Sequence, residues 1–555
     1  MSNIYPSNLR NYFLKDTLLD YLNIYGDSSL KDSSAFPESN FTQLMFDLGN
    51  QYENEIVKRI ITLATQHNLT YYTVVRNNSD TTPYKQTKDA FDLKTDIIFQ
   101  PFLKDWNTGL AGYPDIVISN HAFKTIWGEE ADGEYVVIDV KFSNYSQTTV
   151  ESGYNRFIRA QLAIYNTLLQ QVIFKKSSKK IGSKYGYIIS KTSDESNLGK
   201  LTKVLLADEE LNRDIYSAIK WIQLVRKEGK NWCIRSDRPI DKVKETIVKE
   251  LFPNLGNQYD YPWRGYKTLL AEQFKEVSYL WGIGTKIRET LHEGLVYDFE
   301  DECVNEELSN IMNVETNKYK NIDSIIQTLL CESDDIKENC MERIDKIKYM
   351  YLDIEGCYQF NLFQKGRQFM TCVGIGQYIQ KNNKKFDLET NWEQKIFFID
   401  ELDQNKEEKM INQVIDYLKY EMIDSELIIL HYTSAERKFL SQLQERGVKF
   451  KSVDLAVCFK YFWEKGYIQT FPINNFKLKT IVQKLTDLHY INEDPYKNCK
   501  IKSGLEVASI YNRLKDISNV EYRNTLIQEI LEYNTQDCKS LYLVYLLLKI
   551  KFSLL

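Results

Sequence analysis

The sequence predicts an α/β protein with more than one domain. Its 555 residues exceed the usual size of a single domain, and 43% hydrophobic with 27% charged residues is ordinary for a globular protein. Stretches rich in β-branched residues at 112–118, 134–142 and 347–355 have the pattern of buried strands, and helical patterns follow them. We therefore expect an N-terminal α/β domain over residues 1–235, a mainly helical connector over 236–345, and a C-terminal α/β domain over 346–555.

Acidic and basic residues cluster on two predicted strands of the N-terminal domain. Residues 112–118 and 134–142 are the two strands, and Asp139 and Lys141 are two residues apart, so they project from one face. Asp115 reaches the same point if the strands pair as a hairpin. The carboxylates would then hold a divalent ion, while the ammonium of Lys141 positions or activates water.

This pattern resembles the PD-(D/E)XK nuclease core, in which Pro114-Asp115 and Asp139-Val140-Lys141 supply the named motif. Two flanking motifs resemble its RecB-like branch: Gly49-x-x-x-Glu53 and Gln161-x-x-x-Tyr165. The resemblance implies a restriction-endonuclease-like fold, with Glu53, Asp115 and Asp139 as metal ligands and Lys141 serving the attacking water. Gln161 and Tyr165 would support the site or the substrate. Many members also carry a four-cysteine iron–sulfur cluster, which is not expected here because residues 1–232 contain no cysteine.

The connector contains a short glycine-bounded turn between helical patterns. Leu280-Trp-Gly-Ile-Gly-Thr-Lys-Ile-Arg resembles a helix–hairpin–helix motif. Gly282 and Gly284 would expose backbone N–H groups that take a phosphate without reading sequence, and Lys286 and Arg288 would add charge. Two interpretations stay open: contact with DNA, or a helical spacer.

The C-terminal domain offers a second set of converging oxygen ligands. Asp353 and Glu355 end a predicted buried strand and share one of its faces, while Tyr533 and Asp537 are four residues apart on a predicted helix. Carboxylates from a strand and a late helix are what a two-metal phosphodiester-cleaving site needs, because hard divalent cations take oxygen ligands.

These motifs resemble the DEDD exonuclease family, in its variant with a tyrosine four residues before the last aspartate. The resemblance implies an RNase H-like fold (the DnaQ-like type), two Mg²⁺ or Mn²⁺ ions, and degradation from a 3′ end, with Tyr533 orienting the water. The run Leu427 to Leu440 resembles the second motif, but Glu436 stands where the family has aspartate. The order of the whole chain is similar to that of fused RecB-like and RNase H-like nucleases.

The composition of the chain bears on its partners, its metal sites and the compartment in which it is expected. The formal net charge of −6 gives no global sign of nucleic-acid binding, so phosphate contacts must come from local patches. The nine cysteines form no C-x-x-C pair, so we expect no zinc site and a reducing compartment. The N-terminus lacks signal-peptide features, and the most apolar run, 541–548, is too short to span a bilayer. We expect a soluble intracellular protein.

The expected function is a metal-dependent nuclease with two active sites, acting in DNA repair, replication or nucleic-acid turnover. Its expected partner is DNA, single-stranded or at ends, or RNA. Two alternatives stay open. One is a non-catalytic nucleic-acid-binding scaffold with one or both sites degenerate, which the glutamate at 436 favours. The other is a subunit that is active only within a helicase complex.

Overall fold

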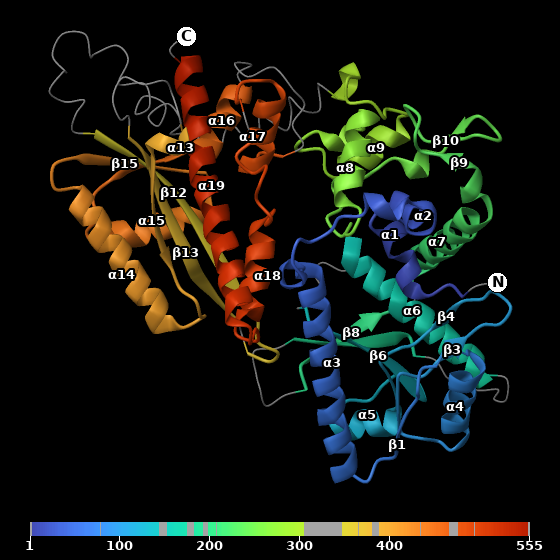
Figure 1. Cartoon of the computed structure of the whole chain (residues 1–555). Helices are drawn as coiled ribbons and strands as arrows, with labels where there is room; N and C mark the ends of the chain where they lie inside the picture. Colours follow the sequence, from blue (N-terminus) through green and yellow to red (C-terminus); the bar gives the residue numbers. More distant parts are fainter. Residues whose placement is uncertain are drawn as a thin grey trace. The chain divides into compact units, whose positions relative to one another are not determined.

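The protein is a mixed α/β molecule that forms two compact units (Figure 1). The computed structural model describes residues 3–77, 79–143, 153–174, 183–191, 198–206, 208–304, 347–364, 366–379, 388–432, 434–464, 475–492 and 494–552. Unit 1 comprises Met1–Asp32, Met45–Glu276 and Asn361–Lys365, and unit 2 comprises Ser33–Leu44, Val277–Phe360 and Gly366–Leu555. The change from one unit to the other at residue 276 falls inside the predicted connector, of which residues 305–345 lie outside the described ranges.

Unit 1 is built on a six-stranded mixed sheet. Strands β2 and β5, β5 and β6, and β7 and β8 pair antiparallel, while β1 and β2, and β6 and β7, pair parallel. The strands, in their order across the sheet, are β1 (Tyr71–Thr73), β2 (Ile97–Phe99), β5 (Ile116–Ser119), β6 (Tyr135–Lys141), β7 (Tyr185–Ser190) and β8 (Lys200–Leu205). The two acid-bearing strands, β5 and β6, therefore pair, which meets the condition for Asp115 to approach Asp139 and Lys141.

Helix α3 (Phe41–Gln66) covers one face of this sheet. Its Tyr52, Ile56, Ile60 and Ala64 recur every four residues and are fully buried in one hydrophobic core with the strands. The Gly49-x-x-x-Glu53 motif lies within α3, which begins at Phe41. A Cβ at Gly49 would meet no atom within 4 Å, so packing does not require glycine there. The other elements of unit 1 are α1 (Arg10–Phe13), α2 (Leu18–Tyr25), α4 (Thr81–Asp92), α5 (Asn120–Trp127), α6 (Gly153–Phe174), α7 (Glu209–Glu228), α8 (Arg264–Gln273), and the short strands β3 (Leu103–Lys104), β4 (Ala111–Gly112), β9 (Trp232–Cys233), β10 (Ile240–Asp241) and β11 (Thr246–Ile247).

A buried ionic cluster ties the N-terminal segment of unit 1 to its last helix. The ammonium of Lys267 on α8 lies 2.8 Å from a carboxylate oxygen of Asp16 and 2.7 Å from one of Asp260. It also donates to the backbone oxygens of Asn254 and Asn257, both at 2.9 Å. Lys267 and Asp16 are fully buried, so the pairing is what makes these charges tolerable in the interior.

Unit 2 is built on a five-stranded sheet. Strand β12 pairs antiparallel with β13, which pairs antiparallel with β14, whereas β12, β15 and β16 run parallel. In order across the sheet the strands are β14 (Trp392–Phe398), β13 (Arg367–Tyr378), β12 (Ile347–Gln359), β15 (Glu426–His431) and β16 (Lys451–Asp454).

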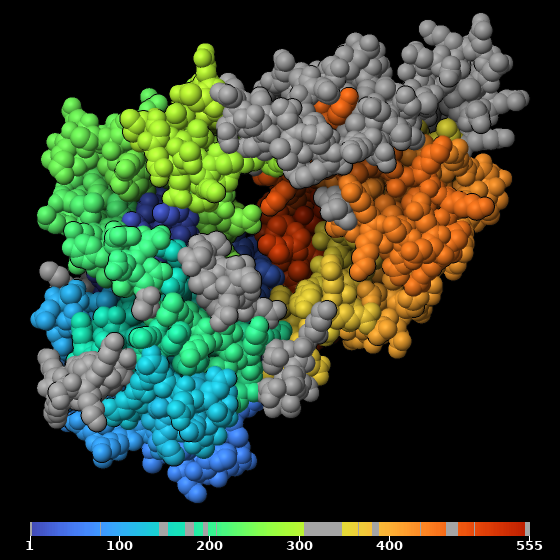
Figure 2. Space-filling model, turned by 180° about the vertical axis from the view of Figure 1, so that it is seen from behind, coloured from blue at the N-terminus to red at the C-terminus, as the bar shows by residue number. Residues whose placement is uncertain are grey.

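The two faces of the unit 2 sheet carry different helices (Figure 1). Met350 and Leu352 of β12 point into a core made with α14 (Gln404–Glu421) and α15 (Ser434–Glu445). Tyr351 points the other way, into a core made with α19 (Val520–Phe552). The remaining helices are α9 (Thr285–Glu293), α13 (Leu388–Asn391), α16 (Leu455–Glu464), α17 (Leu478–Asp487) and α18 (Gly504–Leu514). Figure 2 shows, in orange, the surface that residues 400–450 present to solvent.

Candidate metal centres

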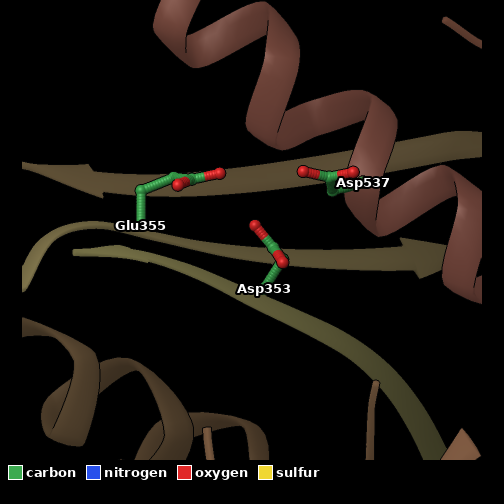
Figure 3. A group of neighbouring side chains, drawn as sticks. All are labelled: Asp353, Glu355 and Asp537. Carbon is green, nitrogen blue, oxygen red and sulfur yellow. The ribbon is translucent and has the colours of Figure 1, made fainter. Parts of the chain in front are cut away.

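Three carboxylates converge at the sheet of unit 2 (Figure 3). Asp353 and Glu355 come from β12 and Asp537 from α19, and each offers an oxygen within 4.8 Å of those of the other two. Among the residues that the structure describes, this is the one group of three acidic, cysteine or histidine side chains gathered so closely. Strand alternation explains it: residues 351, 353 and 355 share the face on which α19 packs.

A glycine beside Asp353 in the sheet leaves room for the side-chain amide that supports this carboxylate. Asn534 on α19 is fully buried and donates to Asp353 Oδ2 at 2.7 Å. Gly374 on β13 lies opposite Asp353 in the sheet, and a Cβ there would lie 1.9 Å from Asn534 Oδ1. A glycine at this position is therefore required for Asn534 to hold the carboxylate.

Glu436 approaches the same group from a third element. It lies in the first turn of α15, just after β15, and is 4% exposed. Its Oε2 lies 3.8 Å from Nδ1 of the buried His431, and its charge is close enough to raise the pKa of Asp353 and Glu355. Glu436 therefore lies near these carboxylates but outside the group of three whose oxygens lie within 4.8 Å, and its role as a ligand stays a prediction. We call Asp353, Glu355, Glu436 and Asp537 the unit 2 cluster.

Two tyrosines hold Asp537. Tyr533 lies one helical turn before it on α19, and its hydroxyl is a hydrogen-bond partner of the carboxylate that lowers the carboxyl pKa. Tyr496 also donates a hydrogen bond to Asp537 Oδ1. Only Tyr533 was expected from the sequence. Tyr496 precedes α18 in an irregular segment, and no spacing rule connects it to residue 537.

A lysine adds positive charge beside this group. Lys479 on α17 lies 4.0 Å from the ring centroid of Tyr533 and donates to the backbone oxygen of Lys502 at 2.6 Å. Its charge lowers the pKa of Glu355 and Asp537. The nearness of this half-buried lysine to acidic residues on other elements can be recognised only in the folded chain.

Burial dominates the electrostatics of the unit 2 cluster. It is the largest cause that raises the pKa of Asp353, Glu355 and Asp537, and repulsion within the group adds to it. The pKa of Asp537 is raised only to about 6, because hydrogen bonds from Tyr496 and Tyr533 and the charge of Lys479 act against the effect of burial. Several buried carboxylates in mutual repulsion are unfavourable without a counter-charge, and their hard oxygens match magnesium or manganese. The donor set therefore fits divalent cations.

A second acidic group lies in unit 1, where β5 and β6 pair. Asp115 directly precedes β5, and its Oδ2 accepts the backbone N–H of Val140 at 2.7 Å. Asp139, 1% exposed, lies 2.6 Å from the ammonium of Lys141. Burial and then the charge of Asp139 raise the pKa of Asp115. The hairpin thus brings these three predicted residues together.

Glu53 reaches this group from α3 through Gln100. The Gln100 amide donates to Glu53 Oε1 at 2.5 Å and to Asp115 Oδ1 at 3.2 Å, and it accepts a hydrogen bond from Arg76. The backbone φ of Gln100 is +53°, a conformation that residues other than glycine rarely adopt. We call Glu53, Asp115, Asp139 and Lys141 the unit 1 cluster. Gln100 and Arg76 lie outside any motif, so sequence reasoning missed them.

Gln161 and Tyr165 lie one turn apart on α6, and the Gln161 amide donates to the Tyr165 hydroxyl at 3.0 Å. The Tyr165 ring packs against Gly112, where a Cβ would lie 2.4 Å from ring atom Cε1. Burial raises the pKa of Tyr165, and the nearby charge of Asp139 adds to the effect. Gly112 therefore has a packing role that its place in the strand motif did not indicate.

The glycine-bounded turn lies in unit 2, directly before α9. Gly284 caps the helix N-terminus, Gly282 has a φ of +90°, and both are exposed, as is Lys286. Arg288 differs from the expectation: it is 6% exposed. A guanidinium packed into the protein is poorly placed to meet a phosphate. Phosphate contact through Gly282, Gly284, Lys286 and Arg288 stays a prediction, and the burial of Arg288 counts against its own part in that contact.

No protein-family model matches this chain, and no curated protein matches it. Within the described ranges, no helix combines the length and apolar character needed to cross a membrane.

Proposed function

We propose that this chain is a divalent-metal-dependent nuclease with one active centre in each unit. The observation that supports it most is the convergence of Asp353, Glu355 and Asp537, whose oxygens lie within 4.8 Å of one another. With Glu436 they would hold Mg²⁺ or Mn²⁺. Cations bound there would supply the positive charge that offsets the charge developing on a phosphodiester during cleavage.

The chain's own residues in unit 2 would orient substrate and water. Tyr533, on the face of α19 that carries Asp537, would orient the attacking water by a hydrogen bond. Lys479, whose ammonium lies 4.0 Å from the ring centroid of Tyr533, would add positive charge beside the same carboxylate and support binding of the phosphate. The DEDD resemblance, with its RNase H-like fold, makes 3′-end degradation the proposed reaction of this centre.

In unit 1, Glu53, Asp115 and Asp139 would hold one cation, and Lys141 would position the water. The 2.6 Å pairing of Lys141 with Asp139 supports this assignment, because it keeps the ammonium at the carboxylates before substrate arrives. Gln161 and Tyr165 would complete the wall of the site. This arrangement is the one proposed from the resemblance to RecB-like nucleases.

The proposal is tested with purified full-length protein and end-labelled oligonucleotides. Single- and double-stranded DNA and RNA are incubated with Mg²⁺, Mn²⁺ or EDTA. We expect metal-dependent cleavage, loss of 3′-end products in Asp353→Ala, and loss of the other products in Lys141→Ala. A wild-type protein that binds but does not cleave in either metal would favour the scaffold alternative. Cleavage that appears only on addition of a helicase would favour the subunit alternative.

A further inference from the structure

A series of aromatic rings in unit 1 runs from the interior to the surface. The buried Phe13 lies 6.4 Å from Phe157, and Phe157 lies 6.0 Å from Tyr154, between ring centroids. Tyr154 in turn stacks on Tyr259 with centroids 5.2 Å apart and planes 15° from parallel. Tyr259 is 55% exposed. The outermost ring therefore offers a supported aromatic surface to solvent.

The loop that carries Tyr259 is anchored. The backbone N–H of Tyr259 donates to Asn257 Oδ1 at 3.0 Å, and the Asn257 amide donates to Asp16 at 2.8 Å. The backbone oxygen of Asn257 also accepts from the buried ammonium of Lys267. An exposed tyrosine on such a loop is pre-organised, so a flat ligand that stacks on it has little ordering entropy to overcome.

The stacked pair begins on the helix that carries Gln161 and Tyr165. Tyr154, Gln161 and Tyr165 are seven and four residues apart on α6, so they share one face of that helix. The Tyr165 ring packs against Gly112, three residues before Asp115 in the chain, so this face of α6 leads to the strands that carry the unit 1 cluster. A strand that runs from the unit 1 cluster along this face of α6 would pass the tyrosine pair.

We propose that Tyr259, backed by Tyr154, is a base-stacking platform that makes single-stranded nucleic acid the substrate of the unit 1 centre. The inference rests on the proposed nuclease function and names the substrate class for this centre. Base stacking on an aromatic side chain is insensitive to sequence, because every base has a π-face. In a duplex both faces of each base are already covered by neighbours, so the platform selects a strand that has been unpaired.

The decisive measurement is photocrosslinking of the full-length protein in Ca²⁺ to a single strand of about 12 nucleotides that carries 5-iodouracil. We expect the crosslink in the tryptic peptide that spans residues 250–264, at Tyr259, and competition by unlabelled single strand but not by duplex. Tyr259→Ala should lose the crosslink and weaken binding by about 5-fold to 150-fold, the range for loss of one base–aromatic stack. Tyr259→Trp should retain both.

The matched control is Tyr216→Ala on α7. This tyrosine is 60% exposed and pairs only with Lys220 in the contacts that the structure gives, so its loss should leave binding unchanged. Cleavage by the wild type together with an unchanged crosslink in Tyr259→Ala would overturn the platform and leave the nuclease function standing. A Tyr259-dependent crosslink in a protein that never cleaves would support the platform and refute the nuclease function.

Discussion

Replacing Glu355 by glutamine should stabilise the metal-free protein while abolishing exonuclease activity. The change keeps the size of the side chain and removes one charge. Glu355 is 7% exposed, and burial followed by the charge of Asp537 raises its pKa well above the ordinary 4.5. A buried carboxylate that is needed to bind a cation is unfavourable in the metal-free protein. Replacing it should therefore raise the stability of the fold while removing the activity.

The magnitude follows from the spacing of the group. Two unit charges 4.8 Å apart repel by about 3.5 kcal/mol at an effective dielectric constant of about 20. Glu355 has two such neighbours, Asp353 and Asp537. Proton uptake relieves part of this repulsion, so we expect the variant to gain about 3 kcal/mol at pH 8, the size of a single pair interaction.

The pH dependence of unfolding shows at which pH the Glu355→Gln variant should be more stable than wild type. Because the pKa of Glu355 is raised on folding, its folded form retains a proton that the unfolded chain has lost, and stability falls as pH rises through the folded pKa. Wild type and Glu355→Gln should therefore unfold alike below about pH 4.5, and the advantage of the variant should grow above it. Calorimetry in EDTA across this range measures the difference.

Metal addition provides the second readout. Wild type should gain about 2.7 kcal/mol when Mn²⁺ is 100 times its dissociation constant, and Glu355→Gln should gain much less. Glu445→Gln, an exposed change of the same chemistry on α15, should behave as wild type throughout. The reasoning is refuted if Glu355→Gln is less stable than wild type in EDTA at pH 8, or if Mn²⁺ stabilises both equally.

Three further predictions concern single side chains. Lys141→Ala should remove cleavage by the unit 1 centre while calorimetric Mn²⁺ binding persists, and retained cleavage in an Asp353→Ala background would contradict its role. Glu436→Asp should keep exonuclease turnover, whereas Glu436→Ala should lower it strongly at limiting Mn²⁺; equal rates would show that Glu436 is not a ligand. Lys267→Met leaves the buried carboxylate of Asp16 without its positive partner. The backbone amides of α8 should therefore exchange hydrogen as if this region were about 3–5 kcal/mol less stable. Unchanged exchange would contradict the stabilising role given to the Lys267 ionic cluster.

Much of the site was accessible from the sequence because strand and helix periodicities are local. The two-residue spacing of Asp353 and Glu355 and the four-residue spacing of Tyr533 and Asp537 each predict a shared face, and the structure places them so. The same holds for Asp139 and Lys141 on β6. The position of Glu436 followed from the family resemblance alone, since nothing in its own surroundings marks a ligand.

Other residues became visible only when the chain was folded. Gln100, Tyr496 and Lys479 bridge or flank the carboxylates from loops and helices that have no periodic relation to them. The burial of Arg288 likewise opposes its hydrophilic chemistry, because packing around α9 rather than residue type decides its exposure.

By itself the sequence determined the mixed α/β class and which acidic side chains share a face of a strand or helix, and it left the pairing of the two acid-bearing strands in unit 1 as a condition. These depend on interactions between residues near in the chain. Only the tertiary structure decided that Asp537 meets Asp353 and Glu355 within 4.8 Å, and that Gly374 leaves room for the amide that holds Asp353. It also decided that Lys267 anchors the loop of Tyr259. These depend on which distant segments pack together, and that is set by the burial of whole faces rather than by any local pattern.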